Sequence, residues 1–505
     1  MSRTSASKAM ATIAGIGAMA LVMTACGSST PAATSPTSSA SSAGSSSAGS
    51  SSSSSSAASS AGGAGSSSAA PSSSSAGTGG ASAGGAVMKS DDATYCDFIK
   101  KTWPNISGKS VGVYSSITGD EATQLVSSWK DFTDCAGATV KFNGDKNFET
   151  QVVVQAKSGN ASDIAFVPQP GLLAQLVATG KVAEPAASVA ANVDKYWDKS
   201  WKGYGTVNGK FYAAPLGANV KSLVWYSPKT FKAKGYTVPK TWDEMIALSE
   251  KIAATGEKPW CAGVESGTAT GWTATDWLEE TVLRQAGPDV YDQWVSHKVQ
   301  FSDAPIAAAL KTVGSIWKNP KYMNGGIGDV SSIATTPFTD GGLPIQSGKC
   351  YMHQQASFYA TNFKGKPVVS ETGDIFAFYL PSMGDKFGKP VEVGGEFVAA
   401  FNKRPEVQAF QWYLTTAHWA NNQSKNSKSR ISANKGLDVA NVGDPINKLS
   451  VSIIQDPKSV ARFDASDLMP AAVGSAAEWK QLTSWITGQE DAATLSGIDA
   501  AWPAS

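Results

Sequence analysis

Residues of the types used in hydrolytic catalysis occur in this sequence, but their spacing forms no catalytic motif. Gly108-Lys109-Ser110-Val111-Gly112 fits the G-x-S-x-G pattern of serine hydrolases. Ser110, however, opens an expected strand, whereas the nucleophilic serine of that pattern stands at the turn between a strand and a helix. The three histidines form no HExxH pair, and the sequence has no P-loop. Acidic residues are scattered along the chain, so a pair of carboxylates acting on a glycosidic bond stays open as an alternative.

The first cysteine stands in a context that predicts lipid attachment. Arg3 and Lys8 precede an apolar stretch of small residues, and Met23-Thr24-Ala25-Cys26 resembles a bacterial lipobox. We therefore expect residues 1–26 to be a lipoprotein signal peptide, with Cys26 as the lipidated first residue of the mature chain. Its acyl chains would anchor the protein to the outer face of the bacterial cell membrane.

The remaining four cysteines are an even set in an exported chain, which favours two disulfides. Four cysteines can pair in three ways. We expect Cys96–Cys135 near the start of the folded part and Cys261–Cys350 further along the chain. The sequence contains no CxxC pair, so it indicates no zinc or other metal site, and it indicates no cofactor.

A long low-complexity stretch separates the leader from the folded part of the chain. Residues 27–90 are almost entirely Ser, Ala, Gly, Pro and Thr. Such a composition cannot bury enough apolar surface to offset the entropy of ordering, so we expect a disordered tether. The rest of the 505 residues is long enough for two or more domains. A formal net charge of +1 gives no electrostatic reason to expect a nucleic-acid partner.

Strands and helices alternate through the first part of the folded chain. The expected strands cover residues 110–114, 139–142 and 163–167, and the expected helices cover 121–134, 148–158 and 171–179. This alternation predicts a parallel, doubly wound sheet, whose ligands lie in the loops at the carboxyl ends of the strands. Later expected strands are 348–352, 375–380 and 393–401, and later expected helices are 275–285, 405–419 and 476–486.

The stretch from Lys210 to Ile246 contains several recognisable local structures in succession. Asn208-Gly209 before it predicts a tight turn, because Gly tolerates a positive φ. An apolar run at 211–215, a loop at 217–221 and a strand at 222–226 follow. Gly235 is expected to end a short helix. Thr241 and Glu244 have the spacing of a capping box, which begins the next helix.

The order of these blocks resembles a known family. The segments SDIAFVPQPGLLAQLVATGKVAEP and KFYAAPLGANVKSLVWYSPKTFKAKGYTVPKTWDEMI are similar to substrate-binding proteins of carbohydrate ABC importers, the maltose- and α-glucoside-binding type of solute-binding protein family 1. The resemblance extends from about Gly108 to the C-terminus.

This resemblance implies an α/β, two-lobed, periplasmic-binding-protein-like fold. Each lobe would be a doubly wound sheet flanked by helices, with the ligand cleft between the lobes. The implied boundaries are 91–220 and 367–430 for lobe 1, with the strand at 375–380 returning to it, and 221–366 and 431–505 for lobe 2. Crossings near 217–221, 366–375 and 430–435 would act as hinges.

The resemblance also implies ligand-binding residues. Neutral sugars stack on aromatic rings and form hydrogen bonds with planar polar side chains. Residues expected to contact the ligand from the first lobe and the crossing strands are Ser116, Asp120, Gln169, Asn219, Lys221 and Glu396. Those expected from the second lobe are Phe358 and Trp479, which align with the family's stacking positions, and Trp272 and Asp276 in an exposed Gly/Thr-rich loop.

We therefore expect a monomeric, extracytoplasmic solute-binding component of an ABC transporter, and not an enzyme. It would capture a sugar or oligosaccharide, α-glucoside-like in type, and deliver it to permease subunits in the membrane. Two alternatives stay open. One is a secreted glycoside-active enzyme, and the other is an adhesive or structural lipoprotein with a non-functional cleft.

Overall fold

Two main sheets organise the part of the chain that the computed structural model describes, residues 94–326 and 328–504. The expected signal peptide with Cys26 (residues 1–26) and the expected tether (residues 27–90) lie outside these residues. No described helix is both long and apolar enough to cross a membrane.

The larger sheet has six strands in the order β13-β12-β3-β1-β2, and β6 is also paired to β12. Its strands β1, β2 and β3 are parallel, as the alternation of strands and helices predicts. β12 is antiparallel to β3 and β6 and parallel to β13. The strand bounds are β1 (Ser110–Ser115), β2 (Thr139–Gly144), β3 (Ile164–Val167), β6 (Ala213–Val220), β12 (Lys389–Ala400) and β13 (Ser459–Phe463).

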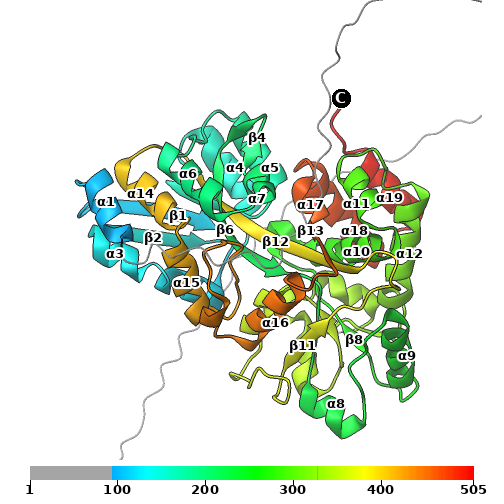
Figure 1. Cartoon of the computed structure of the whole chain (residues 1–505). Coiled ribbons are helices and arrows are strands. Elements are labelled where there is room, and N and C mark those ends of the chain that lie inside the picture. The colour runs from blue at the N-terminus through cyan, green and yellow to red at the C-terminus, as the bar shows by residue number, and fades with distance from the viewer. Residues whose placement is uncertain (1–93, 327, 505) are drawn as a thin grey trace, which may run out of the picture. The chain divides into compact units, whose positions relative to one another are not determined.

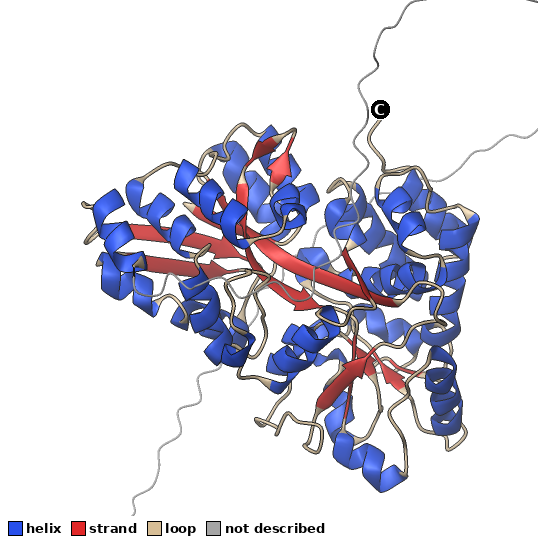
Figure 2. Ribbon diagram, viewed as in Figure 1, coloured by secondary structure: helices blue, strands red, loops and turns tan. Residues whose placement is uncertain are grey.

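Helices cover both faces of the parallel part of this sheet (Figure 2). On one face Trp129 and Phe132 pack with Phe410, and on the other Phe148 and Val152 pack with Leu173. We call these elements and the β4–β5 hairpin the first lobe. Their bounds are α1 (Tyr95–Thr102), α2 (Gly119–Ser127), α3 (Lys130–Ala136), α4 (Phe148–Ser158), α5 (Pro170–Ala178), α6 (Ala187–Tyr196), α7 (Lys199–Tyr204), β4 (Thr206–Val207), β5 (Lys210–Phe211), α14 (Pro405–Tyr413) and α15 (Ala417–Asn426).

The second lobe is built around a three-stranded antiparallel sheet, β10-β7-β11, and a short parallel pair, β8-β9, so the doubly wound sheet expected for this lobe is wrong. Its strands are β7 (Leu223–Tyr226), β8 (Trp260–Cys261), β9 (Met323–Asn324), β10 (His353–Gln354) and β11 (Phe376–Tyr379). Its α-helices are α8 (Pro228–Lys234), α9 (Trp242–Ala253), α10 (Trp272–Gln285), α11 (Pro288–Val295), α12 (Ala304–Trp317), α13 (Phe338–Gly341), α16 (Pro445–Ile454), α17 (Ala465–Leu468), α18 (Trp479–Ile486) and α19 (Asp491–Asp499).

Short turns of other helix types complete the described structure. The 3₁₀ turns are η1 (Gly267–Ala269), η2 (Val330–Thr335), η3 (Leu343–Ser347), η4 (Ser357–Thr361) and η5 (Val439–Asn441). A π-helical segment, η6 (Val473–Glu478), leads directly into α18, so the helix expected at 476–486 is only partly α-helical.

β12 connects the two lobes. Its first residue in the sheet, Lys389, pairs with Ser459 of β13, and its last, Ala400, pairs with Ile164 of β3. β6 runs beside it in the opposite direction, and β7 of the second lobe follows β6 after only two residues. Figure 1 shows β12 running from the group of elements around β1 and β2 toward the group around α10.

The local structures expected around residues 206–246 occur in the described chain. Asn208 (φ 49°) and Gly209 (φ 76°) form the turn of the β4–β5 hairpin. Gly235 ends α8 in a left-handed conformation (φ 66°). The Thr241 hydroxyl accepts a hydrogen bond from the Glu244 N–H (3.2 Å) at the start of α9. The Glu244 carboxylate accepts one from the N–H of Lys240 (2.7 Å). These structures depend on neighbouring residues alone, so sequence reasoning predicts them well.

The loop expected at 217–221 is wrong, because β6 continues through it to Val220. Backbone hydrogen bonds to β12 hold these residues extended, and pairing runs from Ala213↔Ala399 to Val220↔Val393. The helix expected at 121–134 is divided into α2 and α3, and the helix at 405–419 is divided into α14 and α15. In the second case the Thr416 hydroxyl caps α15 by accepting the Trp419 N–H (3.1 Å).

Two expected strands also differ from the structure. Residues 375–380 do not return to the first lobe, because β11 pairs with β7 along Phe376↔Tyr226 to Tyr379↔Leu223. The strand expected at 348–352 is reduced to a bridge between Met352 and Trp260, and the paired residues are the following two, in β10. Neither change could be read from local sequence, because both depend on which distant strand supplies the hydrogen bonds.

Both expected cysteine pairs occur as disulfides in the structure. Cys96–Cys135 joins α1 to α3 (Cα–Cα 5.7 Å), and Cys261–Cys350 joins β8 to the segment before β10 (Cα–Cα 5.8 Å). The first attaches the N-terminal helix to the first lobe. The second lies within the second lobe.

Candidate ligand-binding cleft

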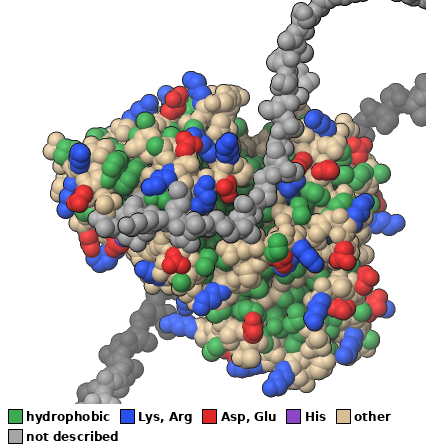
Figure 3. All heavy atoms as spheres, viewed as in Figure 1, with side chains coloured by type: hydrophobic (Ala, Val, Ile, Leu, Met, Phe, Trp, Pro, Cys, Tyr) green, Lys and Arg blue, Asp and Glu red, His purple; other side chains and the backbone are tan. Residues whose placement is uncertain are grey.

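A cleft of about 640 Å³ lies between the two lobes, among the described residues. This volume is within the range of small-molecule sites. First-lobe elements and crossing strands contribute Ser116–Glu121, Lys146, Glu149, Pro168, Gln169, Asn219, Lys221, Gly394–Glu396 and Arg430. The second lobe contributes Ser266, Ala269, Trp272, Thr275, Phe338, Thr339, Phe358, Thr361–Lys366, Asp464, Ser466, Asp467 and Trp479. On the face shown in Figure 3, basic and acidic side chains are interspersed.

The structure brings most of the expected ligand-binding residues together. The residues that line the cleft are Ser116, Asp120, Gln169, Asn219, Lys221, Trp272, Phe358, Glu396 and Trp479. Asp276 does not line it, because its side chain is buried within the second lobe. Trp272 is also not in a loop: it is the first residue of α10 and is half-buried.

Aromatic rings form one wall of the cleft. The Trp272 ring lies 5.2 Å from the Phe338 ring and 6.1 Å from the Phe358 ring, centroid to centroid. Sequence reasoning missed Phe338, whose only local signal is its position after Pro337 at the start of α13. Rings of this kind offer flat faces on which the C–H groups of a sugar can pack.

Buried polar atoms without partners mark where a ligand would complete the hydrogen bonding. Gln169 Oε1, Asn219 Oδ1, Glu149 Oε2 and Trp479 Nε1 have no hydrogen-bond partner among the described residues, and all four residues line the cleft. Leaving such groups buried and unpaired is costly, and most buried polar groups in proteins are paired. Three acceptors and one indole donor are therefore available to a bound polar molecule.

The position of Gln169 follows from its neighbours. Pro168 and Pro170 restrict the backbone on both sides, and Pro170 is the first residue of α5. Gln169 itself is extended (φ −102°, ψ 116°) and only 5% exposed. A stiff, buried amide loses little further entropy when it binds a ligand.

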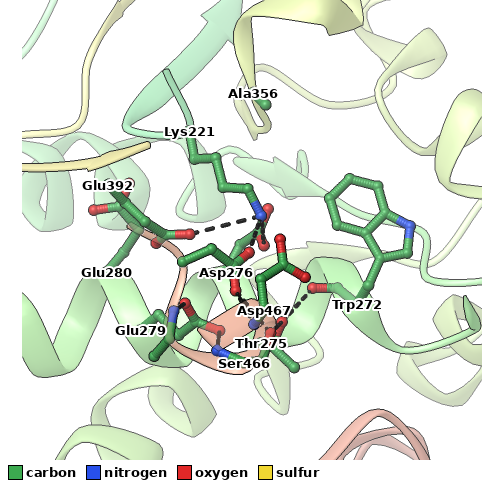
Figure 4. A network of polar contacts seen from close by, with 12 residues as sticks. Lys221, Trp272, Thr275, Asp276, Glu279, Glu280, Ala356, Glu392, Ser466 and Asp467 are labelled. Carbon is green, nitrogen blue, oxygen red and sulfur yellow. Dashed lines mark hydrogen bonds and ion pairs between the residues drawn. The ribbon is translucent and has the colours of Figure 1, made fainter. Parts of the chain in front are cut away.

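Lys221 is held by acidic residues and is not a free ligand-binding group. Its Nζ lies 2.8 Å from Asp276 Oδ1 and 3.8 Å from Glu392 Oε1, and it also pairs with Asp464 (Figure 4). The ammonium lies 5.4 Å from the centre of the Trp272 ring. Burial acts to lower the pKa of Lys221, but the surrounding carboxylates dominate and raise it well above its usual value. Asp276 is thus a counter-ion of Lys221, which explains why it lies away from the cleft.

The three acidic residues around Lys221 have the composition of a cation site. One carboxylate oxygen each of Asp276, Glu392 and Asp464 lie within 4.8 Å of one another. The ammonium of Lys221 contacts all three carboxylates. The positive charge at this point is therefore supplied by the chain itself.

Further buried carboxyls surround this group. Burial and neighbouring acids raise the pKa values of Glu279, Asp467 and Glu478 well above the usual range, and they do the same for Glu392 within the group. The second buried cation here, Arg284, pairs with Glu280 and donates to the carbonyl oxygens of residues 380 (2.8 Å) and 381 (3.1 Å). Asp467 lines the cleft, so this polar cluster forms part of its floor.

Arg430 organises the first-lobe side of the cleft. Its guanidinium pairs with Glu396 of β12 and, at 2.8 Å, with Glu121 of α2. Glu396, expected to accept hydrogen bonds from ligand hydroxyls, therefore already has a cationic partner. Sequence reasoning missed Arg430 and Glu121 as residues of the site, because their pairing joins segments 309 residues apart.

Glu149 is a further cleft residue that sequence reasoning missed. It lies in the first turn of α4, and burial raises the pKa of its carboxyl to about 7. A carboxyl with a pKa raised in the folded state makes folding less favourable as the pH rises from its usual pKa toward 7, because the folded state must then carry a buried charge.

We expect Glu149→Gln to flatten part of the pH dependence of stability. The melting temperature of the wild type should fall more between pH 5 and pH 8 than that of the variant. Thermal unfolding at the two pH values measures the difference. The matched control is Asp120→Asn, which removes an exposed carboxylate from the same cleft. Equal pH slopes in the wild type and Glu149→Gln would contradict the prediction.

Several known proteins resemble this chain in sequence. Residues 116–352 match the family described as bacterial extracellular solute-binding protein. The chain is 36% identical over 409 residues to the osmoprotective compounds-binding protein GgtB of Synechocystis sp., covering 79% of this chain and 95% of that protein. It is 35% identical over 410 residues to the alpha-glucosides-binding periplasmic protein AglE of Rhizobium meliloti. This match covers 79% of this chain and 88% of AglE.

Solved structures share the fold at lower sequence identity. The solute receptor AcbH superposes with a TM-score of 0.68 at 18% identity, covering 78% of this chain and 98% of that one. The maltose-bound protein MalE3 of T. maritima superposes with a TM-score of 0.60 at 17% sequence identity. The match covers 78% of this chain and 98% of that one. These neighbours confirm the two-lobed α/β fold expected from the sequence. The family match over residues 116–352 and the extensive similarity to GgtB and AglE show that this chain belongs to the bacterial extracellular solute-binding protein family.

Proposed function

We propose that this protein captures a neutral sugar of α-glucoside type between its lobes and delivers it unaltered to an ABC permease. The observation that carries the proposal is one cleft in which flat aromatic rings stand beside buried, unpaired amide, carboxyl and indole atoms. Of the two relatives that match most of this chain, one is named for binding alpha-glucosides and the other for binding osmoprotective compounds, and the first name favours an α-glucoside.

The chemistry of the cleft fits a sugar better than an ion or a peptide. Sugars present apolar C–H faces, which pack on rings such as Trp272 and Phe358, and hydroxyls that both donate and accept. Hydroxyls would donate to Gln169 Oε1 and Asn219 Oδ1 and accept from Trp479 Nε1. The buried basic groups Lys221 and Arg430 already have carboxylate partners, so neither is available to pair with an anionic ligand.

Ser116 and Asp120 are proposed to contact the ligand at the rim of the cleft, where both lie in the loop and first turn leading into α2. Glu396 is proposed to do so through the carboxylate oxygen that Arg430 does not take. Asp276 and Lys221 support the cleft floor, with Lys221 also beneath the Trp272 ring.

Capture depends on movement of the lobes about the crossing segments. The first crossing is the two-residue link between β6 and β7, and the second is the strand β12. The third lies near residues 430–435, where Ile431 forms an isolated antiparallel β-bridge with Ala218. Among the described residues, lobe 1 thus comprises residues 94–220 and the chain from the middle of β12 to about residue 430, in place of the expected return segment 367–430. A ligand that contacts both lobes shifts the population toward the closed arrangement.

The protein would act outside the cytoplasm as a monomer. Cys26 carries the lipid anchor, and residues 27–90 serve as a tether that lets the lobes reach the permease. The relatives are binding proteins and not enzymes, and no catalytic step, cofactor or metal forms part of the proposal.

A thermal-shift screen with sugars tests the proposed function. A ligand that binds only the folded state at one hundred times its Kd stabilises it by about 2.7 kcal/mol. We expect α-glucosides to raise the melting temperature and to be recovered chemically unchanged. Turnover of the sugar would favour the glycoside-active enzyme. No shift with any mono- or oligosaccharide would favour a cleft that no longer binds.

A further inference from the structure

Helix α5 touches the second lobe through a glycine. Gly171 is the second residue of α5, directly after Pro170, and is buried. A Cβ atom built on Gly171 would collide with the carbonyl oxygen of Met469 and would lie 3.4 Å from the amide nitrogen of Ala471. Met469 and Ala471 follow α17 in the second lobe, so the obstruction is backbone of the opposite lobe and not a flexible side chain.

The conformation of Gly171 does not itself require glycine. Its φ is not in the positive region, and it lies within a regular helix. Glycine in a helix is about 1 kcal/mol less favourable than alanine. The close approach of the second lobe is therefore the structural feature that requires the missing side chain.

On each side of this contact between the lobes, a residue two positions earlier in the chain lines the cleft. Gln169, whose Oε1 is unpaired, precedes Gly171 by two residues. Asp467, which lines the cleft, precedes Met469 by two residues. The approach of α5 to residues 469–471 therefore sets the separation of the two cleft walls at this end.

A second glycine lies at another contact between the lobes. A Cβ on Gly267 of η1 would lie 2.9 Å from the carbonyl oxygen of Lys146, just before α4. Gly267 has a φ of +60°, so its conformation alone favours glycine. Gly171 is thus the position where the effect of lobe contact can be isolated.

We infer that Gly171 is a positioning residue for ligand capture, because only a residue without a side chain lets α5 approach the second lobe as closely as it does in this structure. This inference rests on the proposed function for its ligand, but the closing contact itself does not depend on which solute is bound. A methyl group at residue 171 holds the lobes apart at one end and weakens the closed, ligand-bound state.

The test compares Gly171→Ala with Gly203→Ala in the full-length protein. Gly203 lies in α7 of the same lobe, is exposed, and has no atom within 4 Å of a built Cβ. Calorimetric titration with the best α-glucoside of the thermal screen should give an affinity about tenfold or more weaker for Gly171→Ala. Gly203→Ala should bind like the wild type. The ligand-free melting temperature of Gly171→Ala should be unchanged or higher, whereas a role in ordinary core packing would lower it.

A distance measurement gives a readout that does not need sugar binding. Spin labels at Val154→Cys on α4 and Lys311→Cys on α12 are exposed and lie in different lobes. Double electron–electron resonance, with and without sugar, should show that the shortest distance population of the wild type and of Gly203→Ala is lost in Gly171→Ala.

The outcomes separate this inference from the proposed function. If the wild type binds no sugar, the proposed function fails, while the distance distributions still test the contact at Gly171. Identical distributions in all three proteins would overturn the inference. So would equal sugar affinities of Gly171→Ala and Gly203→Ala, or a loss of affinity accompanied by an equal loss of ligand-free stability.

Discussion

Replacing Lys221 with methionine is expected to lower the free energy of unfolding by about 3–5 kcal/mol. The ammonium is the cationic partner of Asp276, Asp464 and Glu392, and all four side chains are at most 7% exposed. Methionine has similar length, so little packing is lost, but three carboxylates are left without their cation. Removing one partner of a buried ion pair costs more than the pair contributes, because the remaining charge stays desolvated. Urea denaturation at pH 8 measures the loss.

The pH dependence of this variant distinguishes charge from packing. Burial already raises the pKa of Asp276 to about 7, and loss of Lys221 should raise it further. At pH 5 Asp276 and Glu392 of the variant should be protonated and no longer repel their neighbours, so the difference in free energy of unfolding between the variant and the wild type should be smaller than at pH 8. Lys229→Met is the matched control: its ion pair with Asp374 (2.7 Å) is exposed, so its removal should cost less than about 1 kcal/mol. If Lys221→Met lowers the free energy of unfolding by the same amount at pH 5 and pH 8, the electrostatic explanation is wrong.

Trp479→Ala is expected to weaken sugar binding by about 2 kcal/mol or more, roughly thirtyfold in Kd. Trp479 is the first residue of α18, lines the cleft and has an unpaired Nε1. Its carbonyl oxygen lies against Gly271 (φ 113°), which brings it next to Trp272. Alanine removes both a stacking face and a hydrogen-bond donor. Isothermal titration calorimetry measures the change.

Two further variants separate the contributions of Trp479. Trp479→Phe keeps an aromatic face and removes only the donor, so it should lose less affinity than Trp479→Ala. Trp502→Ala removes a partly exposed tryptophan that stacks on His297 and does not line the cleft, so it should leave affinity unchanged. If Trp479→Ala binds sugar as tightly as the wild type, this residue does not contact the ligand.

Features of the fold that depend on near neighbours in sequence were predictable. The helix at 148–158 and the turn at Asn208-Gly209 agree with the structure, because helix periodicity and the φ requirement are local properties. The strand through Gly217 was not predictable in this way. Its glycine disfavours a strand, and the β12 residues that hold it extended lie about 180 residues later in the sequence. The assignment of residues 375–380 to the wrong sheet has the same cause.

In the candidate site, too, features that depend on local sequence were predictable and features that depend on distant residues were not. Gln169, Asn219 and Trp479 could be identified by resemblance, because each stands in or beside a recognisable block of sequence. Their unpaired atoms could not be foreseen, because pairing depends on every surrounding residue. Asp276, on α10, is buried against Lys221 and therefore does not line the cleft. The helix α10 begins at Trp272, three residues before the predicted start at residue 275. Trp272 and Asp276 are therefore both helical, and only Trp272 lines the cleft.

The side-by-side crossing of β6 and β12 has a mechanical consequence. Two strands joined by backbone hydrogen bonds resist bending within the plane of their sheet, whereas twisting about the strand axis is a deformation that sheets accommodate readily. Relative rotation of the lobes should therefore have one soft axis, and other directions should be stiff. The protein would then sample a narrow, nearly one-dimensional path of shapes, so that a permease meets the same pair of faces each time the solute is enclosed.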